Sequence, residues 1–411
     1  MKYKVEEILN KAKLFKGDNL IWLKSLADNS VDSVVTDPPY LLSFMGKKWD
    51  HDVPSVEFWK EVYRVLKPGG HVLSFGGTRT YHRMTVNIED AGFEIRDQIM
   101  WIYGSGFPKS HNIGKAVDKI EGNERKKIRS IGSQVTGGGQ LNGKNSRKEA
   151  FVTEGSTELE GWGTALKPAN EPICVARKPL SEKTVALNAL KYGTGGLNIE
   201  ESRIESGIRT KPINSEDIRI DNSLFGLNPN VQRERIEIYE GRFPSNVIMD
   251  EYAGNELDEE QRKFFCCPKV SKKERNLGMK ENVETFIQRP RRLDGSVIYK
   301  ETHPEEWNHA MKNLSRKDKT SIAAAEEKLQ SQNTGDKNIH PTVKPVDLMR
   351  YLIKLVTPKN GVICDPFMGS GSTGVGTLIE DFNFIGMEMD QEYFEIAKQR
   401  IQNFEEFKEL L

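Results

Sequence analysis

The segment GVICDPFMGSGSTGVGTLIEDFNFIGMEMD, residues 361–390, decides the fold class. It predicts a buried strand ending at Asp365, a glycine turn, a helix that the turn opens, and a second strand ending at Glu388. Gly369 and Gly371 let the backbone turn sharply and lie close to a ligand. This order of elements is typical of a parallel α/β sheet that binds a ligand at the carboxyl ends of its strands.

The acidic residues of this segment restrict the ligand. Glu388 lies 17 positions after Gly371, where a carboxylate can accept both ribose hydroxyls of an adenosine. Asp365 precedes the glycines, where it can meet a cationic group. An acid at this place differs from a dinucleotide fingerprint, which requires bare glycines for a pyrophosphate, and the segment also lacks the Gly-Lys-Ser/Thr of a phosphate loop. S-adenosylmethionine, an adenosine with an ammonium and no phosphate, fits both acids. The open alternative is a glycine-rich helix start used only for packing.

A second motif, Asp37-Pro38-Pro39-Tyr40, follows the short apolar run VDSVV. Each proline fixes φ and removes an N–H donor, so the turn is rigid and its carbonyls are free to face a ligand. The Asp37 carboxylate and the Pro38 carbonyl can accept hydrogen bonds from an exocyclic amino group of a base, which frees the nitrogen lone pair. Tyr40 offers a flat face for the base. The alternative is a purely structural role, in which the turn only ends a strand.

Length and composition set broad limits. The 411 residues suggest one large domain with insertions, or two to three domains. The formal net charge is zero, so nucleic-acid binding has to be read from local patches. The cysteines form no C-x-x-C pair and no zinc-like spacing, so we expect no metal, and their scatter fits a reducing cytoplasm. The apolar runs are too short to cross a bilayer.

The two motifs together resemble the amino-methyltransferases of DNA, which modify adenine N6 or cytosine N4. The resemblance is to the permuted class, in which the DPPY motif precedes the glycine turn, and HPTVKP at residues 340–345 is also typical of it. It covers about 1–180 and 338–411, and the segments SFMGKKWD and GSGFPKS resemble prophage-type members. The resemblance implies a Rossmann-like class I S-adenosylmethionine-dependent methyltransferase sheet, circularly permuted, with an inserted target-recognition region. Such a fold places the two motif strands side by side at the switch point.

Domain boundaries follow from the resemblance and from composition. We expect 1–180 to form the N-terminal catalytic half, 181–338 the target-recognition and DNA-binding region, and 339–411 the C-terminal cofactor-binding half. Within the first part, 110–160 reads as a basic, flexible insertion, because 101–150 holds ten Lys and Arg against four Asp and Glu. The stretch 261–300 holds eleven against four.

The resemblance also implies site residues. The catalytic set is Asp37, Pro38, Pro39 and Tyr40. Lys344 is expected to face the carboxylate of the donor's methionine end, and Met389 to pack on its adenine. Asp18 can face the adenine or serve as a plain helix N-cap, and both interpretations stay open. The full expected cofactor set is Asp18, Lys344, Asp365, Phe367, Gly369, Gly371, Thr373, Glu388 and Met389.

Contacts with DNA are expected from two loops, because a base inside a duplex must be flipped out to reach such a pocket. The first loop carries Phe44, Lys47 and Lys48, and the second carries Phe107 and Lys109. The alternative for each is an ordinary surface loop, with Phe44 packed in the core. The basic stretches 109–148 and 262–300 are candidates for phosphate contacts.

The expected function is site-specific methyl transfer from S-adenosylmethionine to N6 of a flipped-out adenine in double-stranded DNA. Asp37 in the first motif position favours adenine within the family. Cytosine-N4 methylation is the nearest alternative, followed by a non-catalytic DNA-binding regulator that keeps the fold, and by methylation of RNA or a small molecule. We expect a DNA-associated cytoplasmic protein of a bacterial or phage-infected cell, with no membrane association. A homodimer and a partner restriction endonuclease are left open.

Overall fold

The computed structural model describes most of the chain in two compact units. The large unit is Met1–Gly104 with Asn170–Leu411, and the small unit is Ser105–Ala169. No helix of the described residues is both long and apolar enough to cross a membrane. The described residues are 5–9, 11–41, 52–104, 106, 110–134, 148–212, 236–250, 253, 265–266, 270–279 and 338–408.

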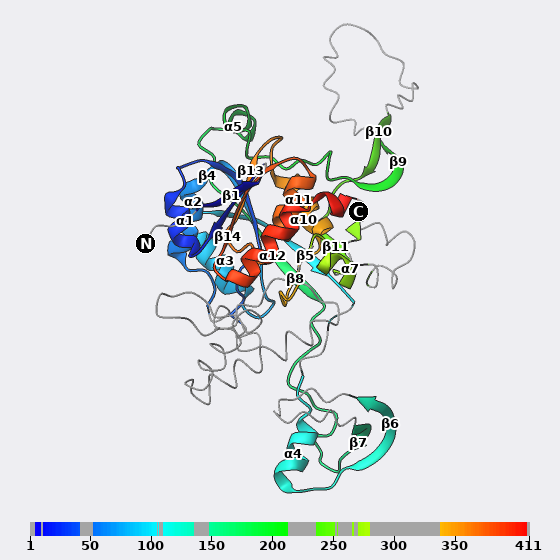
Figure 1. Ribbon diagram of the computed structural model, residues 1–411. Coiled ribbons are helices and arrows are strands. Elements are labelled where there is room, and N and C mark those ends of the chain that lie inside the picture. Colours follow the sequence, from blue (N-terminus) through cyan, green and yellow to red (C-terminus); the bar gives the residue numbers. More distant parts are fainter. Residues whose placement is uncertain are drawn as a thin grey trace, which may run out of the picture. The chain divides into compact units, whose positions relative to one another are not determined.

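A ten-stranded mixed sheet runs through the large unit in the order β1-β2-β14-β13-β3-β4-β8-β5-β11-β12 (Figure 1). The strands β2, β14, β13, β3 and β4 are parallel neighbours, whereas β8 pairs antiparallel with both β4 and β5. The bounds are β1 Val5–Leu9, β2 Ala12–Lys16, β3 Val31–Thr36, β4 Leu66–Phe75, β5 Glu94–Ile102, β8 Asn170–Arg177, β11 Val247–Met249, β12 Phe265–Cys266, β13 Val362–Asp365 and β14 Asn383–Glu388.

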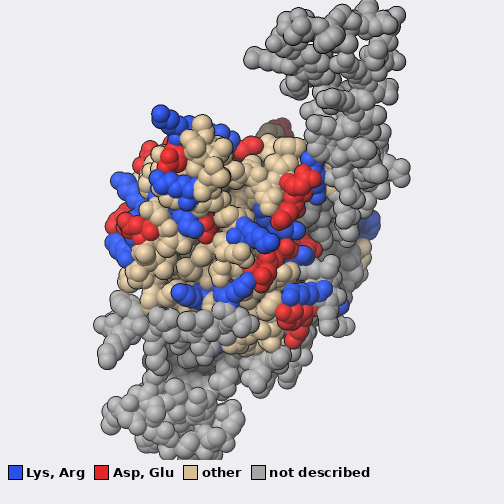
Figure 2. Space-filling view, turned by 90° about the horizontal axis from the view of Figure 1, so that it is seen from above, with Lys and Arg blue, Asp and Glu red and all other residues tan. Residues whose placement is uncertain are grey.

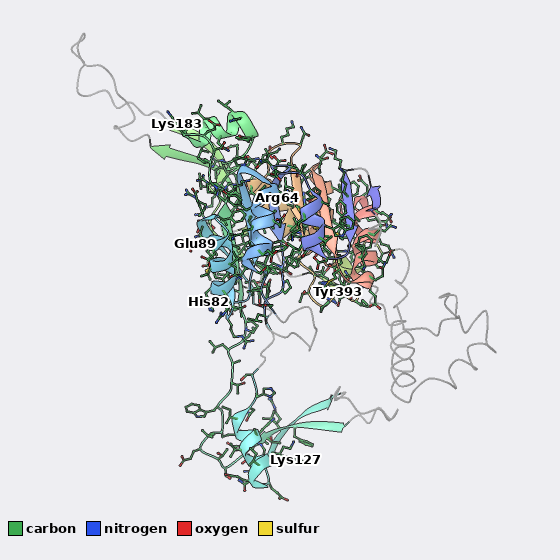
Figure 3. The ribbon with its side chains drawn as sticks, turned by 90° about the vertical axis from the view of Figure 1, so that its left-hand side faces the viewer. Arg64, His82, Glu89, Lys127, Lys183 and Tyr393 are labelled. Atoms are coloured by element: carbon green, nitrogen blue, oxygen red, sulfur yellow. The ribbon has the colours of Figure 1, made fainter. Side chains whose placement is uncertain are left out.

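Helices cover both faces of this sheet, and each face has its own apolar core. The first core joins the sheet to α10, α11, α12 and α13, and the second joins it to α1, α2 and α3. Figure 3 labels Arg64 on α2 and Tyr393 on α12, which belong to the two opposite layers. The bounds are α1 Asn19–Ser25, α2 Val56–Val65, α3 Tyr81–Asp90, α10 Val346–Val356, α11 Ser372–Ile379, α12 Gln391–Gln402 and α13 Glu405–Lys408.

Strand burial explains the sequence pattern that predicted the sheet. All six residues of β3 are buried, because helices lie on both of its faces. The helix α2 buries Phe58, Trp59, Val62 and Val65 at helical spacing, and Ser55 caps it by accepting a hydrogen bond from the Phe58 N–H. Short-range patterning therefore gives the elements, and two-sided burial gives the layers.

Strands from the two ends of the chain meet in the middle of the sheet. The C-terminal strand β13 pairs in parallel with β3, with Cys364 opposite Val34. The chain leaves β3 toward β4 on one side and leaves β13 toward β14 on the other, so the strand order reverses between them. The expectation that the two motif strands lie side by side at a switch point is thus confirmed.

The middle of the chain differs from the pattern expected of a separate region. The strands β11 and β12 extend the main sheet beyond β5, with Ile248 opposite Trp101. Two further elements are the helix α5, Val185–Tyr192, and a hairpin formed by β9, Ile204–Pro212, and β10, Ile236–Arg242. The expected boundaries near 180 and 338 therefore do not coincide with a boundary between compact units. The strands β11 and β12 have three and two residues, and strands this short carry too little periodicity to be predicted.

The small unit has secondary structure where we expected a flexible insertion. It contains the helix α4, Ile113–Glu121, and the antiparallel hairpin of β6, Lys126–Gln134, with β7, Lys148–Glu154. Arg125 joins these elements: its guanidinium bonds Asp118 of α4, Glu160 at 2.7 and 2.8 Å, and the Thr153 carbonyl at 3.0 Å. The exposed Lys127 lies on this hairpin (Figure 3).

Candidate active site

The carboxyl end of β13 and the turn after it form one half of the site. Gly369 and Gly371 have φ of +54° and +80°, a region that favours glycine. A Cβ at Gly369 would lie 2.9 Å from His340 Nε2, and one at Gly371 would lie 3.0 Å from the Ala397 backbone. The two glycines thus make room for the His340 side chain and for α12, and their contact with a ligand stays a prediction.

Asp365 is the anchor of this turn. Its Oδ1 accepts hydrogen bonds from the Thr36 hydroxyl at 2.6 Å and the Phe367 N–H at 3.1 Å, and its Oδ2 accepts one from the Thr373 hydroxyl at 2.6 Å. Burial raises its pKa to about 6, against the effect of these bonds. A carboxylate has about four acceptor positions, so three are engaged inside the protein. A contact with the donor's ammonium stays a prediction.

Glu388 closes the turn from the end of β14. Its Oε2 accepts a hydrogen bond from the Gly369 N–H at 2.8 Å, and its Oε1 accepts one from the Asp390 N–H at 2.7 Å. Burial raises its pKa to about 7. The next side chain, Met389, is 62% exposed. A carboxylate held at the glycine turn beside an exposed apolar side chain fits the ribose and adenine of S-adenosylmethionine.

Asp18 lies at the neighbouring strand end. Its Oδ1 accepts hydrogen bonds from Leu20 N and Ile21 N, so it does cap α1. The preceding Gly17 donates its N–H to the Glu388 carbonyl at 2.9 Å, which follows from the parallel pairing of β2 with β14. The sheet therefore brings Asp18 to the same edge as Glu388. The cap and an adenine-facing position are compatible, and the second stays a prediction.

Phe367 and Thr373 take structural positions in the same turn. The Phe367 ring lies 5.1 Å from the ring of Phe58 on α2, and the side chain packs against that core. Thr373, in the first turn of α11, is buried and donates its hydroxyl to Asp365. Both residues fix the turn against the sheet, which is the condition for any contact with a cofactor.

The second half of the site lies at the end of β3. Asp37 is half-buried, and its Oδ1 accepts a hydrogen bond from the Tyr40 hydroxyl. Its Oδ2 accepts one from Lys344 Nζ at 2.5 Å. Burial raises the pKa of Asp37 in spite of the Lys344 ammonium, and the nearby Glu171 adds to the rise. The Thr80 hydroxyl donates to the Tyr40 carbonyl at 2.5 Å, which holds the rest of the motif.

Glu171 completes this half of the site and was not predicted from the sequence. Its Oε2 lies 3.1 Å from Lys344 Nζ and accepts a hydrogen bond from the Tyr40 hydroxyl at 3.4 Å. Its Oε1 accepts one from the Tyr103 hydroxyl at 3.3 Å. Glu171 is the second residue of the antiparallel strand β8, so it lies at the carboxyl ends of the parallel strands beside it. The available signal was its place at the start of EPICVARKPL, which predicts a return to the sheet.

The segment HPTVKP joins the two halves. His340 lies against Gly369 and edge-to-face on Tyr393, with a ring distance of 4.4 Å, and burial lowers its pKa to about 3. Lys344 reaches the other half, between Asp37 and Glu171. Burial opposes its charge, but the two carboxylates hold its pKa above the ordinary value. Lys344 was expected to face the donor's carboxylate, whereas here its partners are carboxylates of the protein.

The expected DNA-facing side chains cannot be placed, because Phe44, Lys47, Lys48, Phe107 and Lys109 lie outside the described residues. The same holds for most of 262–300. On the face shown in Figure 2, basic and acidic side chains intermingle, and neither sign forms a continuous patch among the described residues. Phosphate contacts at either basic stretch therefore stay a prediction.

A family model and several curated proteins match parts of this chain. The family model matches residues 31–399 of this chain. The family is described as DNA methylase, and its name refers to N6 and N4. Type II methyltransferase M2.MboI of Moraxella bovis is 44% identical over 61 residues, which are 15% of this chain and 22% of that protein. Type II methyltransferase M.BglI of Bacillus subtilis is 40% identical over 65 residues, 16% of this chain and 19% of that protein.

Among solved structures, the PvuII DNA methyltransferase (cytosine-N4-specific) is 14% identical, with a TM-score of 0.43, covering 97% of this chain and 89% of that one. The matched part of this chain spans only about a fifth of the two curated relatives named above. The family model, in contrast, includes both motifs, the antiparallel strand between β4 and β5, and the segment that joins the two halves of the site. The chain belongs to the N6/N4 DNA methylase family.

Proposed function

We propose that this protein transfers a methyl group from S-adenosylmethionine to an exocyclic amine of a base in duplex DNA, and that the amine is N6 of adenine. One observation carries the proposal. The Thr36–Asp365 hydrogen bond places the Asp37 motif directly beside the glycine turn. Family membership and the geometry of Glu388 and Met389 support the choice of cofactor.

The cofactor would be held by the carboxyl ends of β13, β14 and β2. Glu388 would accept the ribose hydroxyls, Met389 and Asp18 would border the adenine, and the glycine turn would lie against the methionine part. When bound, S-adenosylmethionine supplies an electrophilic methyl group. The chain's own contribution at this end is to bind and orient, because positioning of donor and acceptor removes much of the entropic cost of transfer.

The base would be handled by the other half of the site. Asp37 accepts a hydrogen bond from the target amine, together with the Pro38 carbonyl, and so makes the nitrogen lone pair available. Tyr40 borders the base while its hydroxyl holds Asp37. The amine becomes acidic once it carries the methyl group, so Asp37 can then take its proton without being a strong base. These acceptors are fixed before the reaction, which is the arrangement that stabilises a developing charge.

The proposal also states which base is methylated, how that base reaches the site, and where the protein works. Asp37 in the first motif position favours adenine N6 over cytosine N4. A flipped-out base is required because an amine that is paired and stacked inside a duplex cannot reach the Asp37 carboxylate. We further propose that the fold is a circularly permuted class I methyltransferase, that base readers and phosphate contacts lie in 181–338 and 109–148, and that the protein works in the cytoplasm of a bacterial or phage-infected cell.

The test combines transfer in vitro with sequencing in cells. Purified protein is incubated with tritium-labelled donor and unmethylated bacterial DNA, and label in the DNA is counted. DNA from expressing cells is then sequenced by a method that distinguishes N6-methyladenine from N4-methylcytosine. Label at a recurrent adenine site supports the proposal. Label at cytosine would show that the target base is cytosine, and the proposed methyl transfer would stand. Normal donor binding without label in any DNA would contradict the proposal that the protein is a DNA methyltransferase.

A further inference from the structure

The cluster at the end of β3 contains charged groups, Glu171 and Lys344, to which the proposed reaction assigns no role. Two carboxylates and one ammonium converge there from three parts of the chain: Asp37 after β3, Glu171 in β8 and Lys344 before α10. The side chains are 20%, 20% and 8% exposed. The cluster therefore carries a net charge of −1, with the Tyr40 and Tyr103 hydroxyls as further donors.

A second carboxylate has no evident structural need here. The pair of Asp37 and Lys344 is neutral and already bonded at 2.5 Å, and a buried carboxylate without its own cation is costly. Lys344 Nζ nevertheless contacts both acids, and it lies 4.8 Å from the centre of the Phe75 ring. An excess negative charge maintained in such a place calls for a positive charge that arrives during function.

We infer that Glu171 is a positioning residue for methyl transfer, which keeps Lys344 paired when Asp37 turns to the target amine and so preserves a net negative charge at the site. This inference rests on the proposed function. Lys344 already touches both acids, so releasing Asp37 requires only a small movement toward Glu171. The Tyr40 hydroxyl, which contacts the same two carboxylates, can follow in the same way.

Lys344 keeps a partner anion through the whole transfer step only with Glu171 present. The target nitrogen uses its lone pair to form the bond to the methyl carbon, while the methyl–sulfur bond of the donor breaks and its pair stays on sulfur. The sulfonium thereby becomes a neutral thioether, and its positive charge moves to the nitrogen, beside the cluster whose net charge of −1 offsets it. An N–H proton then passes to Asp37, which becomes neutral. Lys344 and Glu171 remain as a matched pair. Without Glu171, Lys344 would be left buried without a partner anion.

The inference predicts the direction of a pH effect. The charged and titratable groups facing Asp37 are Lys344, Glu171, Tyr40 and, from β13, Asp365, with Tyr103 acting on Glu171. Removing the charge of Glu171 leaves Lys344 to hold Asp37 alone, so the pKa of Asp37 should fall. Removing Lys344 as well should raise the pKa of Asp37 again, because only the Tyr40 hydrogen bond then opposes the effect of burial.

The experiment uses four full-length proteins: wild type, Glu171→Gln, Glu171→Gln/Lys344→Met, and Glu89→Gln as control, since Glu89 is exposed on α3 (Figure 3). Carbon-13 NMR follows the Asp37 carboxyl of aspartate-labelled protein without donor or DNA, assigned with Asp37→Asn. Glu171→Gln should shift its titration to lower pH, the double variant should shift it back, and the control should leave it unchanged. An unmoved titration in Glu171→Gln overturns the inference.

Kinetics give the second readout. Glu171→Gln should lower kcat by about 10- to 100-fold, with KM for the donor unchanged and with the acid limb of the pH profile moved to lower pH. Glu171→Asp, which keeps the charge, should recover part of the rate. A loss with an unmoved acid limb and no recovery in Glu171→Asp indicates a merely structural role and overturns the inference. Absence of transfer by the wild type would instead defeat the proposed function, while the NMR titration still decides the charge coupling.

Discussion

Thr36 and Asp365 are 329 positions apart in the sequence, and the Thr36 hydroxyl donates a hydrogen bond of 2.6 Å to the Asp365 carboxylate. Both side chains are buried at adjacent strand ends. The bond ties the residue before the Asp37 motif to the residue before the glycine turn. Two motifs from opposite ends of the chain thus share one anchor.

The first prediction concerns this anchor. Thr36→Val keeps the shape but removes the hydroxyl, and it leaves Oδ1 of a buried carboxylate with only the Phe367 N–H. We expect a loss of about 1–3 kcal/mol in the free energy of unfolding, and weaker donor binding. Urea unfolding and calorimetry with S-adenosylmethionine measure the two effects. Thr36→Ser, which keeps the donor, is the control, and equal effects of the two variants would show that the hydroxyl is unimportant.

The second prediction separates chemistry from binding at Asp37. Asp37→Asn should reduce the methyl-transfer rate by about 10²-fold or more, because an amide is a weaker acceptor and cannot take the proton. Donor affinity should change little, since Asp37 belongs to the other half of the site. Single-turnover transfer and donor calorimetry on the same preparation provide the comparison. A parallel fall of both quantities would place Asp37 in donor binding.

The third prediction concerns pH and Glu388. Burial raises the pKa of Glu388 to about 7, so the ionised form, which the proposal requires as acceptor of the ribose hydroxyls, is lost as the pH falls through about 7. Donor affinity of the wild type should therefore fall toward pH 6, approaching tenfold per pH unit below the pKa. Glu388→Gln should bind more weakly at pH 8 and should remove this dependence. A dependence that survives in Glu388→Gln would have to come from another group, such as Asp365.

The fourth prediction tests the glycine turn as packing. Gly371→Ala would force φ of +80° on a residue with a side chain and push a Cβ to 3.0 Å from the Ala397 backbone. We expect a loss of about 1–3 kcal/mol in the free energy of unfolding, measured with urea. Gly196→Ala is a matched control, because no atom lies within 4 Å of its Cβ position. Similar stabilities of the two variants would contradict the close approach of α12.

Local sequence patterns were sufficient for the parts of the site that lie on parallel strands. The glycine turn, Glu388 and the Asp37 motif each follow a buried strand, and parallel strands bring their carboxyl ends to one edge. Glu171 was not predicted as a site residue because it lies at the start of a strand, and only the antiparallel direction of β8 brings it to that edge. A strand's direction depends on its pairing partners, which a single sequence does not display.

The partner of Lys344 was equally hard to predict. Its segment was expected near the donor, but which carboxylate an ammonium meets depends on the packing of three distant segments. The edge strands β11 and β12 were missed for a different reason. They have three and two residues, too few for a period-2 pattern, and they are held by pairing with β5 and with each other.

The last prediction uses the way in which the small unit leaves the sheet. Ile102 and Asn170 are register partners in the antiparallel pair β5·β8, so the chain departs and returns at adjacent positions. Asp250 fixes the end of β5 without help from the small unit, because its carboxylate accepts hydrogen bonds from Gly104 N and Ala253 N. Both closing contacts lie within the large unit.

Replacing 105–169 by a short glycine-containing turn should therefore leave the large unit folded, since hairpin loops of two to five residues close an antiparallel pair. We expect unchanged donor affinity and a cooperative urea transition. If the small unit supplies phosphate contacts, DNA affinity should fall and its dependence on salt concentration should become shallower. Filter binding over a series of salt concentrations measures both. Loss of donor binding would show that the small unit supports the catalytic sheet, whereas unchanged DNA affinity would leave phosphate contacts to other parts of the chain.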